Sequence, residues 1–239
     1  EWTAEKITAL WDYESQFPEN YFTYQVGHLV TDYFADFFSG REVILDYGCG
    51  AGFLIRHFLQ RGYRMAGTDT SPASLAKVTA NYGEKPGFIG AWQVTELMQQ
   101  QRTFPAIVCC EVIEHLNDEW LAKTVECIYQ LLEPGGVVAF TTPNEEDLSK
   151  SYILCPETQT VFHRWQHVRS WSADSLTAYM SERQLEPIQV EATWFREEQA
   201  ASTTASIKKH IKKFIGHGPT DSDPVQLPHL TGVFRKANS

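Results

Sequence analysis

The sequence predicts an α/β protein in which a largely parallel β-sheet is wrapped by helices. Between residues 42 and 143, short apolar runs alternate with segments whose apolar residues recur at helical spacing. Several runs are apolar at successive positions, as in strands that are buried on both faces. A glycine-rich turn joins the first run to the first helical segment. Alternating strands and helices of this kind favour a parallel sheet with helical crossovers.

The elements are expected in the following order. Residues 1–39 carry aromatic and apolar residues at mostly helical spacing, interrupted by Pro18, and should form a helical N-terminal cap. The core, residues 42–143, should contain strands at 42–46, 64–68, 87–92, 106–110 and 137–141, and helices at 53–60, 72–81, 95–101 and 119–132. A helix at 172–182 and strands at 188–195 and 230–236 should follow.

Two segments, 144–169 and 196–228, do not follow this alternation. Insertions of such length in a compact domain are commonly lids or substrate-binding loops. With 239 residues and 43% hydrophobic residues, the chain can bury one substantial core. We therefore expect one domain with two lid insertions.

Charge and cysteine usage narrow the class of protein. The formal net charge is −10 and the pI is near 5.3, so the overall field repels a phosphate backbone and a nucleic-acid partner is unlikely. The five cysteines are odd in number and contain no C-x-x-C pair, which suits a reducing compartment. The sequence has no apolar run of the roughly 20 residues that a membrane-spanning helix needs. A cytoplasmic location is therefore expected.

The glycine turn indicates a nucleoside-containing ligand. The run DYGCGAG (46–52) lies between a strand and a helix, and Asp69 ends the next strand at the distance where an acid meets ribose hydroxyls. A nicotinamide dehydrogenase would have a third glycine at position 53, where this chain has Phe53. S-adenosylmethionine has no phosphate to place on the helix N-terminus and fits the observed spacing better. A plain structural turn beside a surface acid is the alternative.

Four motifs together resemble the class I S-adenosylmethionine-dependent methyltransferases, in the branch of the ubiquinone-biosynthesis O-methyltransferases. They are DYGCGAG, GTDTS (67–71), CCEVIEHLND (109–118) and LLEPGGVVAFTTPN (131–144), within a resemblance that spans about residues 43–180. The resemblance implies a Rossmann-like, seven-stranded, mostly parallel sheet whose last strand is antiparallel. It also implies S-adenosylmethionine as the cofactor.

The same resemblance assigns the cofactor-binding residues. Gly48, Gly50 and Gly52 would line the methionine end of the cofactor, Asp46 would support its amino group and Asp69 would hold its ribose. Relatives often have an acid beside the adenine after the third strand.

Two aromatic residues complete this set. This chain has Trp92 in the region where relatives carry the adenine-binding acid, and Trp92 could stack on the adenine instead. Tyr24, in the N-terminal cap, resembles the residues that cover the cofactor in this family, although packing in the core is an equal alternative.

A second group of residues points to acceptor chemistry. If the chain becomes helical at Glu111, then Glu111, Glu114 and His115 share one face at i, i+3 and i+4. This E-x-x-E-H segment resembles the metal-binding segment of small-RNA 2′-O-methyltransferases. His167, better aligned than His163, would supply the further histidine of a site for Mg²⁺ or another divalent cation.

Two alternatives to the metal site remain open. In a metal-free site, His115 or His167 would take the proton of the acceptor while the reactants are held in line. In a structural interpretation, Glu114 and His115 only brace a helix. The candidate catalytic residues are therefore His115, His167 and Glu111, and the candidate metal ligands are Glu111, Glu114, His115 and His167.

The acceptor is the least determined feature. We expect O-methylation of a hydroxyl on a small-molecule, sugar or lipid-linked acceptor. Two alternatives are N- or C-methylation of a small metabolite and a non-catalytic role in binding S-adenosylmethionine. Residues 206–216 are expected to form an amphipathic helix with four lysines. This helix could contact a membrane surface or a phosphate-bearing acceptor, or it could be a lid helix whose lysines face water.

Overall fold

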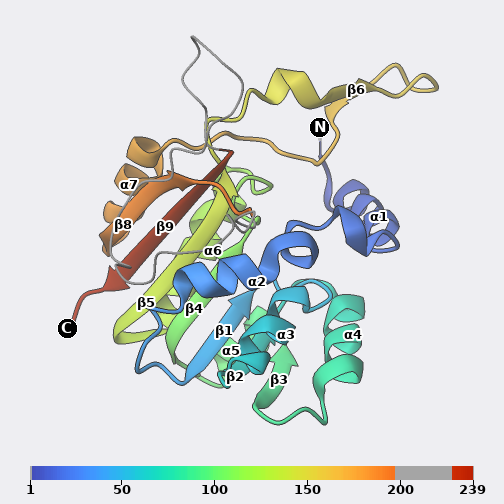
Figure 1. The fold of residues 1–239 in the computed structure, drawn as a ribbon. Helices are drawn as coiled ribbons and strands as arrows, with labels where there is room; N and C mark the ends of the chain where they lie inside the picture. Colours follow the sequence, from blue (N-terminus) through green and yellow to red (C-terminus); the bar gives the residue numbers. More distant parts are fainter. Residues whose placement is uncertain (1, 197–227, 239) are drawn as a thin grey trace, which may run out of the picture.

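A seven-stranded sheet in the order β3-β2-β1-β4-β5-β9-β8 forms the centre of the computed structural model, which describes residues 2–196 and 228–238 (Figure 1). Strands β1 to β5 pair in parallel, and β9 is antiparallel to both of its neighbours. The predicted Rossmann-like sheet with an antiparallel last strand is confirmed. The strands are β1 (Val43–Tyr47), β2 (Arg64–Thr68), β3 (Phe88–Trp92), β4 (Phe104–Cys110), β5 (Leu132–Pro143), β8 (Leu185–Thr193) and β9 (His229–Lys236).

Helices cover both faces of this sheet. One face carries α2 (Phe22–Phe34), α3 (Phe53–Gln60) and α4 (Pro72–Tyr82), and the other carries α5 (Val94–Gln99), α6 (Asp118–Leu131) and α7 (Ala173–Ser181). Ile44 and Leu45 are adjacent in β1, both fully buried, and belong to the hydrophobic clusters on opposite faces. Burial on both faces explains why the strand sequences are apolar at successive positions.

The order of the strands locates a crevice. After β1 the chain adds β2 and β3 on one side, and then places β4 on the other side of β1. Ligands bind outside the carboxyl ends of the strands where the order reverses in this way. The glycine turn follows β1 and Glu111 follows β4, so both predicted functional segments lie at this edge.

The segment after β4 differs from the expectation of a helix that begins at Glu111. Residues 111–117 form a turn, with Glu111 at a left-handed φ of 51° and a hydrogen bond of 3.1 Å from the N–H of His115 to the carbonyl of Val112. Helix α6 begins only at Asp118, after Asn117 accepts a capping bond from the N–H of Trp120. The helical spacing of Glu111, Glu114 and His115 was therefore wrong, because a left-handed residue interrupts a right-handed helix.

The first expected insertion contains structure of its own. A 3₁₀ turn, η2 (Leu148–Ser151), leads into a hairpin of β6 (Tyr152–Leu154) and β7 (Val161–His163) that projects away from the sheet (Figure 1). The second insertion, 196–228, lies almost wholly outside the described residues, and so does the lysine-rich segment 206–216. Among the helices that the structure describes, none has the length and apolar character to cross a bilayer.

The N-terminal cap is helical, as predicted. It consists of α1 (Ala4–Glu14), the 3₁₀ turn η1 (Pro18–Asn20) and α2.

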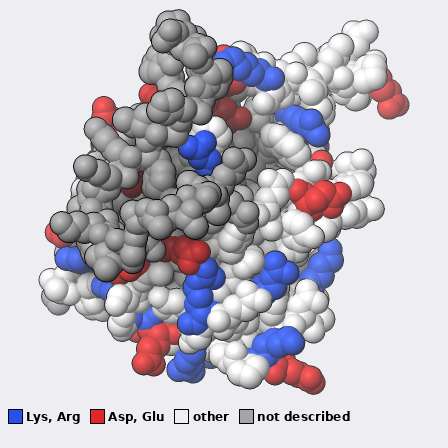
Figure 2. Space-filling view, viewed as in Figure 1, with Lys and Arg blue, Asp and Glu red and all other residues white. Residues whose placement is uncertain are grey.

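Figure 2 shows acidic and basic side chains interspersed among uncharged ones over the described part of one face.

Candidate active site

The glycine turn presents open backbone to the crevice. Gly48, Gly50 and Gly52 have left-handed φ values of 78°, 50° and 79°. A Cβ added to Gly50 would meet no protein atom within 4 Å, so the space beside it is available to a ligand. A Cβ on Gly48 would come within 2.6 Å of Cγ2 of Val112, which shows that the turn touches the segment after β4. Gly52 instead gives room to a neighbouring helix, because a Cβ there would lie 2.8 Å from the Tyr82 ring.

Two aspartates lie beside this turn, Asp46 buried and Asp69 half-buried. Asp46 is 3% exposed, and its Oδ2 has no hydrogen-bond partner within the described part of the chain. Burial and, secondarily, the nearby Asp69 raise the pKa of Asp46 to about 8. Asp69 accepts backbone bonds from Gly50 (2.9 Å) and Ser71 (2.8 Å). An unpaired buried carboxyl oxygen beside open backbone suits a bound ammonium group.

The aromatic residues predicted for the cofactor lie at the same edge of the sheet. Tyr24 packs edge-on against Phe53, the residue that follows the turn, with ring centroids 5.2 Å apart. Trp92 ends β3 opposite Thr68 of β2, the residue before Asp69. The guanidinium of Arg102 lies 4.2 Å from the Trp92 ring centroid. Stacking of Trp92 on adenine and coverage by Tyr24 stay predictions.

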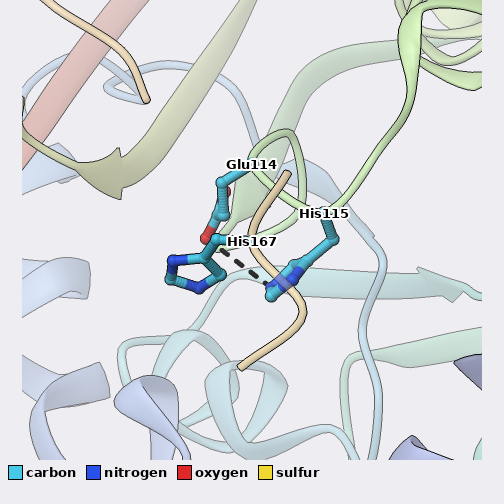
Figure 3. A group of neighbouring side chains, drawn as sticks. All are labelled: Glu114, His115 and His167. Carbon is cyan, nitrogen blue, oxygen red and sulfur yellow. Dashed lines mark ion pairs between the residues drawn. The ribbon is translucent and has the colours of Figure 1, made fainter. Parts of the chain in front are cut away.

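The side chains of Glu114, His115 and His167 converge (Figure 3). Each offers one ligand atom, and these atoms lie within 4.8 Å of one another. Nε2 of His115 is 3.7 Å from Oε1 of Glu114, and the rings of His115 and His167 are 4.8 Å apart. Glu114 and His115 are neighbours in the sequence, whereas His167 lies 52 positions after His115. Glu111 is half-buried, with its Oε1 atom shielded from solvent, but it is not part of this group.

Hydrogen bonds hold the two segments of this cluster together. The N–H of Val168 donates to the carbonyl of Glu114 (2.9 Å), and the side-chain amide of Gln166 donates to the carbonyl of His115 (2.8 Å). Nε of Arg169 donates to the carbonyl of Leu116 (2.9 Å). The loop that carries His167 is thereby fastened to the turn that carries Glu114 and His115.

The electrostatics of the cluster fit a cation. Burial raises the pKa of Glu111 to about 7, and burial together with the charge of Glu111 raises the pKa of Glu114. Burial and the neighbouring His167 lower the pKa of His115 to about 3, so this ring is neutral. Oε1 of Glu111 and of Glu114 and Nδ1 of His115 are buried without hydrogen-bond partners among the residues described. Unpaired buried carboxylates and neutral imidazoles are suitable ligands for a divalent ion.

Two further residues of the site, Glu146 and Trp11, were not among those predicted. Glu146 contacts both His163 and His167, and a second group of possible ligands consists of these three residues. Trp11 of α1 lies edge-on to His115 at 5.0 Å and donates from Nε1 to Oε1 of Gln166 (3.1 Å). The sequence signal for Glu146 was its place just after a strand end, where parallel sheets bind ligands. Trp11 carried no such signal.

Comparison with known proteins identifies the family of the chain. Residues 18–190 match a family described as the methyltransferase domain. The chain is 34% identical, over 136 residues, to a ubiquinone biosynthesis O-methyltransferase of Alkalilimnicola ehrlichii, covering 55% of this chain and 53% of that protein. The chain thus spans about half the length of this curated relative.

Solved structures share the fold. A methyltransferase structure from Clostridium acetobutylicum, described as S-adenosylmethionine-dependent, superposes with a TM-score of 0.61 at 13% identity, covering 98% of each chain. An N1-methyltransferase from Burkholderia thailandensis, solved with bound S-adenosylhomocysteine, superposes with a TM-score of 0.64 at 16% identity, covering 99% of this chain and 92% of the other.

Proposed function

The chain belongs to the class I S-adenosylmethionine-dependent methyltransferases, and we propose on this premise that it methylates a hydroxyl oxygen of a small-molecule, sugar or lipid-linked acceptor. The observation that carries the proposal is the Glu114–His115–His167 cluster beside the glycine turn. Transfer to a hydroxyl needs a group that assists loss of the proton, whereas transfer to a neutral amine nitrogen needs little such help.

The glycine turn and the two aspartates fit the cofactor. Asp46 would accept from the cofactor amino group through its unpaired Oδ2, Asp69 would hold the ribose, and Gly50 leaves room beside the backbone. When bound, S-adenosylmethionine supplies an electrophilic methyl group on sulfur. The protein then has to hold the acceptor oxygen in line with that methyl group and exclude water.

The cluster would activate the acceptor. A ring nitrogen of His115 or His167 that carries a lone pair can accept the hydroxyl proton as the new oxygen–carbon bond forms. Glu114, His115 and His167 together form a donor set that would hold a divalent cation, and Glu111, which lies outside this group, is not needed for it. Such an ion would lower the pKa of an acceptor hydroxyl. The closeness of Val112 to Gly48 supports both arrangements, because the segment that carries Glu114 and His115 then lies near the proposed cofactor turn.

The names of the relatives support oxygen as the acceptor atom. The curated relatives with 28% to 35% identity are named ubiquinone biosynthesis O-methyltransferases. Because the aligned regions cover only part of those proteins, their substrate is not transferred to this chain. The acceptor class remains our proposal.

A pair of measurements tests the function. Calorimetry should detect binding of S-adenosylmethionine by the purified chain. Transfer of labelled methyl groups to a panel of phenols, catechols, sugars and amines should then favour hydroxyl acceptors. His115→Ala and His167→Ala should reduce transfer by about 100-fold or more, the contribution expected of acid–base catalysis, while cofactor affinity stays unchanged.

A control variant and a chelator separate the alternatives. His28→Ala removes an imidazole from α2, outside the cluster, and should retain activity. Loss of transfer in chelator with recovery in Mg²⁺ or Mn²⁺ would support the metal site, and transfer that survives chelation would support a histidine base alone. Full activity in both cluster variants, or methylation of amines only, would overturn the O-methyltransferase proposal.

A further inference from the structure

Glu146, on the loop after β5, lies between two histidine rings. Its Oε2 is 2.5 Å from Nδ1 of His167, and its Oε1 is 3.4 Å from Nε2 of His163. The two rings stack on each other with centroids 4.6 Å apart and planes 19° from parallel. The Glu146 side chain is 19% exposed, and His163 is almost fully buried. One carboxylate thus faces one nitrogen from each ring.

The backbone determines which nitrogen of His163 carries the proton. The N–H groups of Trp165 and His167 both point at Nδ1 of His163, at 3.3 and 3.1 Å. A backbone N–H can only donate, so Nδ1 of His163 must be an acceptor with a lone pair. The proton of the neutral ring therefore sits on Nε2, the nitrogen that faces Oε1 of Glu146. A doubly protonated ring would set donor against donor at Nδ1, so His163 stays neutral.

This arrangement excludes the second group of possible ligands as an ion site. Glu146, His163 and His167 offer atoms within 4.8 Å of one another. However, Nδ1 of His163 is engaged by two backbone donors and Nε2 carries the proton, so neither nitrogen has a lone pair for a cation. The 3.4 Å contact between Nε2 of His163 and Oε1 of Glu146 lacks hydrogen-bond geometry and is therefore electrostatic, with an N–H facing a carboxylate.

The same reasoning extends to His167. The Glu146 carboxyl lies 2.5 Å from Nδ1 of His167. Burial raises the pKa of this carboxyl, but the interactions with His167 and His163 together outweigh burial, so the net shift of the pKa is downward and favours the carboxylate. An ionised carboxylate only accepts, so Nδ1 of His167 must be the donor. If the His167 ring carries a single N–H, its lone pair is then on Nε2.

We propose that Glu146 and His163 are positioning residues that hold His167 in the tautomer with its lone pair on Nε2, the nitrogen that serves the acceptor or the cation. Two backbone N–H groups contact His163, His163 faces Glu146, and Glu146 in turn accepts a hydrogen bond from His167. A carboxylate that fixes a histidine in this way raises the basicity of the remaining nitrogen and orients the ring. Glu146 and His163 have the same positioning role whether His167 binds an ion or takes a proton. The effect of this role on catalysis rests on the proposed O-methyltransferase function.

The proton positions can be measured directly in the unmodified protein. Long-range ¹H–¹⁵N spectra of the full chain with labelled histidine distinguish the two neutral tautomers by the shifts of the ring nitrogens. We expect His167 protonated at Nδ1 only, and His163 protonated at Nε2 only. A proton on Nε2 of neutral His167 in the wild-type chain would overturn the proposal. This measurement uses only the wild-type protein, so it does not depend on whether a variant folds.

A matched pair of variants tests the dependence on Glu146. In Glu146→Gln, the amide oxygen can accept a hydrogen bond from one histidine only. The amide N–H₂ then faces the other histidine as a donor, so His167 should become a mixture of tautomers. Binding of Mn²⁺, followed by electron paramagnetic resonance, should weaken by about 10- to 100-fold, as for lost outer-shell partners. Glu145→Gln removes the adjacent, exposed carboxylate and should change neither readout. An unchanged His167 tautomer in a folded Glu146→Gln chain would contradict the proposal.

The readouts separate this inference from the proposed function. If the wild-type chain binds no Mn²⁺, the metal arrangement fails while the tautomer spectra still decide the role of Glu146. If the tautomers are as expected but no hydroxyl acceptor is methylated, the O-methyltransferase proposal fails and the positioning role stands.

Discussion

At the scale of single residues, the site depends on backbone that only glycine adopts easily. Gly40 and Gly50 both have left-handed φ values, of 73° and 50°, and a Cβ on either would meet no protein atom within 4 Å. They differ in place: Gly40 precedes β1 at its amino end, whereas Gly50 follows β1 at the carboxyl edge. This pair separates the cost of backbone strain from the loss of space for a ligand.

Replacing each of these glycines with alanine gives a matched prediction. Both variants should lose about 1–2 kcal/mol of folding stability, the cost of a left-handed alanine. Only Gly50→Ala should lower the affinity for S-adenosylmethionine, by tenfold or more, because its methyl group would occupy the cofactor space. Chemical denaturation and calorimetry measure the two effects. Equal cofactor affinity in both variants would show that the cofactor lies elsewhere.

At the scale of elements, α1 depends on the site that it covers. A helix of 11 residues is marginal alone in water, even with Thr3 as its N-cap. Trp11 anchors it through ring contacts with His115 and Tyr21 and a hydrogen bond to Gln166. The cap therefore draws its stability from the same turn and loop that carry the candidate catalytic residues.

Removal of this anchor should release α1 without unfolding the sheet. We expect Trp11→Ala to speed amide hydrogen exchange in residues 4–14 by at least tenfold, because two aromatic contacts of about 0.5–1.5 kcal/mol each and one hydrogen bond are lost. Tyr13→Ala, on the same helix but 57% exposed, is the control and should change exchange much less. If both variants exchange alike, Trp11 is not the anchor.

At the scale of the whole molecule, the buried acid at the cofactor edge makes stability depend on pH. The folded-state pKa of Asp46 is about 8, well above the unfolded value near 3.8. Between these values the folded chain binds a proton that the unfolded chain has lost, so stability falls as pH rises toward 8. Histidines 57, 115 and 229 have lowered pKa values and act in the opposite direction, but only below about pH 6.5.

The expected result is a steeper loss of stability between pH 6.5 and 8 in the wild-type chain than in Asp46→Asn. Asp46 alone can contribute up to about 1.4 kcal/mol per pH unit in this window. Denaturation curves without cofactor at several pH values measure the slope. Glu111 and Glu114 remain in both proteins, so the difference between the slopes isolates Asp46. Parallel slopes would mean that Asp46 is ionised in the folded protein.

The sequence by itself determined the fold and the cofactor edge. Continuous apolar runs, helical periodicity and the DYGCGAG turn are local signals, and each corresponds to an element within a few residues. Asp46 lies near the end of a strand, and Asp69 and the E-x-x-E-H segment each follow a strand directly, so all three could be placed at the carboxyl edge. These assignments required no knowledge of contacts between distant segments.

Only the tertiary structure decided how the candidate catalytic residues meet. The left-handed Glu111 replaces the expected helix with a turn. His167 reaches His115 across 52 residues because loop and turn are joined by backbone hydrogen bonds. Glu146 and Trp11 became visible only through their contacts with those residues. Periodicity reports the neighbours of a residue along the chain, whereas proton positions and ligand geometry depend on side chains from separate segments.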